Sequence, residues 1–135
     1  MDEHMDYIIV IEEAPSVSTV VFTEGNNERC LTEEYNFEVV DRETCNVSWY
    51  TIPKGFTWDG ASIPKFAWGV LGSPFGGRYY TAALLHDYFY RTACVTKQFA
   101  DKVFYYKMRQ DGVGWWKANT MYYAVKWFGG GAYSG

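Results

Sequence analysis

Apolar and polar residues follow two different periods along this chain, and the change falls near residue 63. Before it, β-branched and aromatic residues alternate with polar ones, which is the period of a strand with one buried face. After it, apolar residues recur every three to four positions, as they do in helices packed on one side. This order predicts an α+β fold: an N-terminal antiparallel sheet built of hairpins, followed by about three helices.

The first half predicts four strands, over 7–11, 18–22, 35–40 and 45–52. The last two are expected to form a hairpin, because only four polar residues, 41–44, separate them. Asp59-Gly60 then gives a turn signal before the helical half begins.

The second half predicts a short helix and three longer ones. Ser62 is placed to cap the short helix, with Pro64 in its first turn. The longer helices are expected over 78–92, 97–110 and 115–128. We expect a single domain over residues 1–135, mainly β over 1–62 and mainly α over 63–128, with a flexible glycine-rich tail over 129–135.

Composition excludes several classes of protein. The 135 residues are 48% hydrophobic and 20% aromatic, so a core can form without disulfide bonds. A net charge of −4 gives no overall basic footprint for nucleic acid, and we expect none as a partner. Three separated cysteines with no CxxC pair argue against a disulfide framework and a zinc site, and they favour a reducing compartment.

The N-terminus, MDEHMDYIIVIEEAP, is acidic and its apolar run is five residues long. It therefore has the pattern of neither a signal peptide nor a membrane span. No other stretch reaches the length of a transmembrane helix without charges, so we expect no transmembrane segment and no signal-directed secretion.

The candidate chemistry lies in AALLHDYFYR, residues 82–91, where His86 and Asp87 stand side by side in an apolar helix. Burying these two groups is costly unless each has a partner. Neighbours on a helix point about 100° apart, so the two side chains are predicted to have different roles. The short connection 93–96 predicts an antiparallel helix pair, which places Asp101 level with His86.

An aspartate on one imidazole nitrogen leaves the other nitrogen basic, so His86 and Asp101 are candidate catalytic residues. Asp87 and Asp59, with nearby backbone carbonyls, offer the oxygen ligands that calcium takes. Such an ion could bind an ester carbonyl while His86 takes a proton from water. A structural alternative stays open, in which His86 and Asp101 pin two helices together and Asp87 pairs with Arg91.

Four segments resemble a small domain family of unknown function found in tailed bacteriophages and bacteria. They are WDGASIP (58–64), AALLHDYFYR (82–91), ADKVF (100–104) and YAVKWFG (123–129). The resemblance covers roughly residues 50–129 and implies a phage or prophage origin, without an established activity. It leads us to expect the protein in the host cytoplasm after synthesis, or in the virion.

The pattern HDxxYR followed by ADxxF is similar to the helix pair of the phospholipase A(2) superfamily. The resemblance implies that His86 is a general base, that Asp101 orients it, and that Asp87 is a calcium ligand. It also implies that Asp59 and the Trp58–Gly60 backbone complete the ion site. Further supporting candidates are Tyr90, Ser62 and Arg91.

Two function hypotheses follow. The first is a calcium-assisted ester hydrolase acting on a lipid or other ester substrate. The second is a non-enzymatic virion or accessory protein that binds other phage structural proteins, or a second copy, through the aromatic helix 115–128. An enzyme needs an open cleft over His86 and an unpaired ring nitrogen, whereas a structural pin has both nitrogens bonded and closed from solvent.

Overall fold

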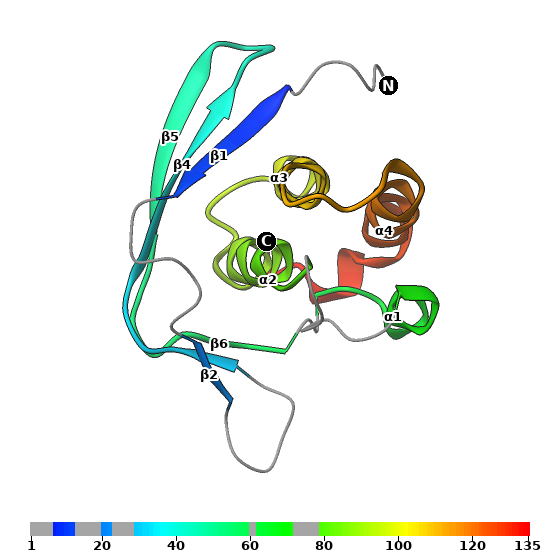
Figure 1. Cartoon of the computed structure of the whole chain (residues 1–135), viewed down its shortest axis with the longest axis horizontal. Helices are drawn as coiled ribbons and strands as arrows, with labels where there is room; N and C mark the ends of the chain where they lie inside the picture. The colour runs from blue at the N-terminus through cyan, green and yellow to red at the C-terminus, as the bar shows by residue number, and fades with distance from the viewer. Residues whose placement is uncertain (1–6, 13–19, 23–28, 60–61, 72–78) are drawn as a thin grey trace.

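The computed structural model describes residues 7–12, 20–22, 29–59, 62–71 and 79–135. Within these residues the chain forms strands first and helices afterwards, which confirms the predicted α+β class. In Figure 1 the strands lie along one side of the molecule and the helices fill the other, with α1 and α4 farthest from the long strands.

The strands form two antiparallel three-stranded sheets. The larger sheet has the order β1-β4-β5 and is made of Ile8–Glu12, Tyr35–Asp41 and Asn46–Ile52. The smaller sheet has the order β2-β3-β6 and is made of Val20–Phe22, Arg29–Leu31 and Thr57–Trp58. The predicted hairpin of β4 and β5 is confirmed, whereas the short strands β3 and β6 were not predicted.

Strand β4 shows why this sequence forms a sheet with one covered face. Alternate side chains of this strand are buried, including Tyr35, Phe37 and Val39. Phe37 reaches the helical layer, where its ring lies 6.0 Å from that of Phe89 in an edge-on contact. The alternation seen in the sequence therefore marks the face that packs on the helices.

The described residues of the second half form four α-helices: α1 (Lys65–Leu71), α2 (Tyr80–Thr92), α3 (Lys97–Gln110) and α4 (Trp115–Phe128). Their positions agree with the predicted helices within a few residues, although residues 72–78, where the second predicted helix begins, lie outside the described residues.

The tight connection between α2 and α3 fixes the pairing of these helices. Helix α2 ends at Ala93, which has a left-handed backbone with φ of 50°. Helix α3 begins after Thr96, whose side chain accepts a hydrogen bond from the Phe99 amide. The reversal between these two caps sets α2 and α3 side by side, so that residues one or two turns from the connection on each helix can meet.

The glycine-rich tail contains a regular turn, and its flexibility stays a prediction. Residues Gly130–Ala132 form a 3-10 turn rather than an open loop. Beyond this turn, the Tyr133 hydroxyl donates to the Val95 carbonyl at 2.5 Å, and the Ser134 amide donates to the Tyr90 carbonyl at 3.0 Å. These contacts fix the end of the chain against α2 and the α2–α3 connection, which glycine content alone does not indicate.

Candidate active site

The α2–α3 pair brings His86 and Asp101 into contact, as its predicted geometry requires. The Nε2 atom of His86 lies 2.7 Å from Oδ1 of Asp101. Both residues are buried, and His86 has no exposed surface at all. Rings of Tyr90 and Phe104 flank the imidazole at centroid distances of 4.0 and 4.7 Å.

The Asp101 carboxylate accepts hydrogen bonds from three side chains at once. Besides His86, the Tyr90 hydroxyl donates to Oδ1 at 2.6 Å. Lys97, one turn earlier on α3, donates to Oδ2 at 2.8 Å. The same ammonium also donates to the Val125 and Lys126 carbonyls at the end of α4, at 2.9 and 3.2 Å. Lys97 therefore ties Asp101 to the negative end of a helix dipole.

These donors keep Asp101 ionised. Burial by itself raises the pKa of Asp101, but hydrogen bonds from His86, Lys97 and Tyr90 outweigh it and hold that pKa below its ordinary value. Burial, together with the bond to Asp101, raises the pKa of the Tyr90 hydroxyl far above its ordinary value. The Tyr90 hydroxyl therefore stays protonated and donates a hydrogen bond to the Asp101 carboxylate.

Ser62 contacts the other side of the imidazole. Its Oγ atom lies 2.8 Å from Nδ1 of His86, so a serine, a histidine and an aspartate stand in line. Ser62 is 5% exposed and lies in the turn that leads into α1. Its hydroxyl also bonds to Asp87 Oδ1, and its backbone amide donates to the same oxygen at 3.2 Å.

The hydrogen-bond roles can be assigned by counting protons. Because Asp101 is a carboxylate, Nε2 of His86 must carry the proton of that bond. In a neutral imidazole, Nδ1 is then an acceptor, and Ser62 donates to it. The hydroxyl has one proton and two possible acceptors, so donation to Asp87 instead requires that Nδ1 carry a proton of its own. The second arrangement therefore holds one proton more than the first.

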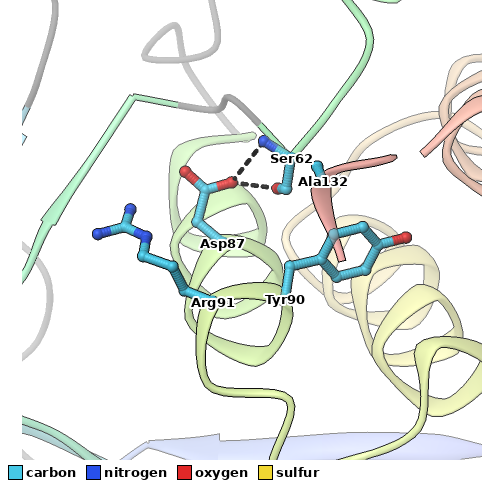
Figure 2. Close-up of a pocket in the computed structure, with 5 residues that line it drawn as sticks. All are labelled: Ser62, Asp87, Tyr90, Arg91 and Ala132. Atoms are coloured by element: carbon cyan, nitrogen blue, oxygen red, sulfur yellow. Dashed lines mark hydrogen bonds between the residues drawn. The ribbon is translucent and has the colours of Figure 1, made fainter. Parts of the chain in front are cut away.

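A cavity of about 140 Å³ lies beside Ser62. Figure 2 shows the Asp87 carboxylate turned toward the backbone and hydroxyl of Ser62, with Tyr90 and Arg91 on the same helix, and Ala132 also lines the cavity. The guanidinium of Arg91 stacks on the Phe56 ring at 4.4 Å. The cavity therefore combines a hydroxyl, a carboxylate and a cation.

The residues predicted for calcium lie in contrasting surroundings. Trp58 is the second residue of strand β6 and is fully buried, while Asp59 directly after it is exposed. Asp87 is buried and bonded to Ser62, and Gly60 lies outside the described residues. Among the residues that the structure describes, no group of three or more His, Cys, Asp or Glu side chains could hold a metal ion.

Sequence reasoning underestimated one residue of this site and missed another. Ser62 was expected to cap a helix and support the site, whereas it contacts His86 directly. Lys97 was not singled out, although its spacing of four residues before Asp101 on one helix is a recognisable ion-pair signal. The contact of Ser62 joins segments 24 residues apart and leaves no periodic trace in the sequence.

Comparison with known sequences places the chain in a family. The profile described as "Protein of unknown function (DUF1353)" matches residues 31–125, and the chain belongs to that family. The match includes Ser62, His86, Asp87 and Asp101, so the whole side-chain cluster lies inside the shared region.

Two relatives come from the bacterium Sinorhizobium fredii (strain NBRC 101917 / NGR234). Uncharacterized protein y4jT is 39% identical over 99 residues, which is 73% of this chain and 28% of that protein. Uncharacterized protein y4iH is 30% identical over 131 residues, which is 86% of this chain and 54% of that protein. The chain thus spans about a quarter and about half of their lengths. No solved structure matches it.

Proposed function

We propose that this protein is an ester hydrolase that uses Ser62 as a nucleophile, His86 as a general base and Asp101 as the group that orients the histidine. The observation that carries the proposal is the continuous hydrogen-bonded line from Ser62 Oγ through both ring nitrogens of His86 to Asp101. Triads of this kind are recognised by geometry and roles rather than by sequence position or fold.

The proposed chemistry proceeds in two steps. Ser62 Oγ attacks the ester carbonyl while its proton passes to Nδ1 of His86, and that proton then goes to the departing alkoxide. Water next attacks the acyl group on Ser62, gives its proton to Nδ1, and the acid leaves as the Ser62 hydroxyl is restored. Throughout, Asp101 stabilises the imidazolium and holds Nε2–H in place.

The cavity limits the substrate. A volume of about 140 Å³ has room for a short acyl or alkoxy group, and a longer chain would extend out of the cavity. Arg91 lines the cavity, and its guanidinium, which lies on the Phe56 ring and is turned away from Ser62 in Figure 2, would have to rotate to meet an anionic substituent. We therefore expect short-chain esters to be the best substrates of the enzyme.

Calcium stays a separate prediction that this mechanism does not need. The serine takes the place of the activated water in the calcium-assisted hypothesis, so no step passes through the ion. Titration of calcium into the wild type and Asp87→Asn tests that prediction by itself.

A second candidate function has its own supporting observation. His86 is closed from solvent and bonded on both ring nitrogens, which is the arrangement expected above of a structural pin in a non-enzymatic phage protein and not of an enzyme with an open cleft over His86. In that case the exposed aromatic residues of α4 would form the surface through which the protein binds its partner. The phage origin and the location in host cytoplasm or virion stay predictions.

The deciding experiment measures hydrolysis of p-nitrophenyl esters of increasing acyl length by the wild type and by Ser62→Ala. We expect activity on the shortest esters, and a fall of at least about a thousandfold in kcat in the variant. Thr81→Val, a buried hydroxyl elsewhere on α2, is the matched control and should keep the activity. A wild type that hydrolyses none of the esters, or a Ser62→Ala variant that matches it, would favour the structural pin.

A further inference from the structure

Helices α1 and α4 contact each other and expose several large aromatic side chains. Trp116 is 61% exposed and Trp127 is 66% exposed, and Tyr123 stands between them on the same side of α4. Phe128, at the end of α4, meets the exposed Phe66 of α1 with ring centroids 5.4 Å apart. We call these five residues the aromatic face.

Three residues of the aromatic face, Trp116, Tyr123 and Trp127, lie away from the buried side of α4, whereas Phe128 follows the buried Ala124 by four residues and is exposed at the end of the helix. That helix packs inward through Ala118, Met121, Ala124 and Val125, which are all buried. Residues 116, 123 and 127 fall on the opposite side, at helical spacings of seven and four. The helix is therefore apolar on two sides, and within the described part of the chain only one of them packs into the core.

The two helices that carry the aromatic face are positively charged. The sequences of α1 and α4, KFAWGVL and WWKANTMYYAVKWF, contain no acidic residue. Their lysines Lys65, Lys117 and Lys126 are exposed, although the whole chain carries a net charge of −4. Lys126 Nζ lies 5.6 Å from the Tyr123 ring, so cation and aromatic groups are interleaved.

We propose that the aromatic face docks on the surface of an anionic lipid bilayer, with α1 and α4 lying flat against the headgroups. Tryptophan and tyrosine favour the interface between water and hydrocarbon, because each ring is apolar with one polar atom. The lysines would meet anionic headgroups. No described helix is long and apolar enough to cross a membrane, so docking would occur in the plane of the surface.

Charge favours a lipid surface over a second copy of the chain. Two aromatic faces brought together would place their lysines near one another with no acidic residue from α1 or α4 to pair them. An anionic bilayer supplies the opposite charge over the whole face. The proposal does not depend on the hydrolase function, because none of its residues lines the cavity beside Ser62.

The test is sedimentation with vesicles of phosphatidylcholine alone, or of phosphatidylcholine mixed with phosphatidylglycerol. We expect binding to the mixed vesicles, accompanied by a blue shift of tryptophan fluorescence, and much weaker binding to phosphatidylcholine alone. The double variant Trp116→Ala/Trp127→Ala should lose about tenfold or more in affinity. Lys117→Gln/Lys126→Gln should lose affinity for the mixed vesicles only, by about fivefold for each lysine.

Trp49→Ala is the matched control, because Trp49 is 69% exposed but lies on β5 in the sheet half (Figure 1). This variant should bind vesicles like the wild type, and unchanged thermal melts should show that all variants are folded. The proposal is overturned if the wild type binds neither vesicle. It is also overturned if Trp49→Ala weakens binding as much as the double variant. A third contradictory result is self-association that the double variant abolishes, without vesicle binding.

Discussion

Helix α3 carries the same ion-pair spacing at its two ends, and the two pairs behave differently. Near its start, Lys97 donates to Asp101 at 2.8 Å, and near its end, Lys107 donates to Asp111 at 2.9 Å. In the first pair the aspartate is the more buried partner, with 3% of its side chain exposed. In the second pair the lysine is the more buried one, with the same 3% exposed.

The surroundings of the pairs explain the difference. Asp101 has three donors, so its pKa is lowered despite burial. For Asp111, burial raises the pKa most, and Glu12, which shares Lys107, raises it further against the effect of the lysine. The same spacing thus gives two different results. At the start of α3 it gives a carboxylate that is hydrogen-bonded to His86, and at the end of α3 it gives an ion pair that joins this helix to β1.

The comparison teaches that burial and pairing alone do not identify chemistry. The Lys107 pair has charge and burial, but a lysine ammonium between two carboxylates only donates. The Asp101 pair continues through His86 to Ser62, which lines a cavity, and the proposed reaction moves a proton between Ser62 and His86. A candidate active site differs from a structural ion pair in two ways: a proton can move between its groups, and a substrate can reach one of them through a cavity.

The largest effect is expected when Asp101 is removed. Asp101→Ala leaves His86, Tyr90 and Lys97 without their shared acceptor, and two of these groups are fully buried. Breaking such a buried network costs about 3–5 kcal/mol of unfolding free energy. Urea denaturation followed by circular dichroism measures the loss. Gln98→Ala, at an exposed position on the same helix, is the control and should change the midpoint little.

A smaller effect is expected at the other end of α3. Lys107→Met removes the cation between Glu12 and Asp111, but each carboxylate keeps 26% of its side chain exposed and can be hydrated. We expect a loss of about 1–3 kcal/mol in the same denaturation experiment. Ester hydrolysis should be unchanged in this variant. A loss of hydrolysis in a folded Lys107→Met protein would contradict the distinction between the two pairs.

The smallest effect concerns pH. Because the pKa of folded Asp101 is lowered, its contribution to stability is present above the unfolded pKa and is lost as pH falls through the folded value. Lys97→Met removes one of the donors that lower this pKa, so acid unfolding should begin at a higher pH. Melting temperatures measured across the acid range test this. Lys102→Met, one residue after Asp101, should leave the acid range unchanged.

Local patterns predicted much of the fold. Alternation along 35–40 and 45–52 identified the hairpin, and the spacing of apolar residues identified the helices. The meeting of His86 and Asp101 followed from one short connection, since helix geometry fixes which residues lie level. These features depend on residues close in sequence or on regular elements.

Features that depend on distant segments were not predicted. Strands β3 and β6 are three and two residues long and are defined by pairing rather than by composition. The position of Ser62 against His86 depends on how the turn before α1 packs on α2. The hydrogen bond from Tyr133 to the Val95 carbonyl also joins segments that are far apart in the sequence. The glycine content of the tail predicted no such contact.

The nucleophilic role of Ser62 is tested most directly by covalent labelling with a fluorophosphonate, followed by peptide mass spectrometry. These reagents phosphonylate serines that a neighbouring base activates. We predict that the wild type carries the label on Ser62, and that folded His86→Gln, which lacks the base, is labelled far more slowly. A folded wild-type protein whose Ser62 peptide stays unlabelled under prolonged exposure would contradict the account. The Ser62–His86–Asp101 line would then be a structural link between the turn before α1 and the α2–α3 pair.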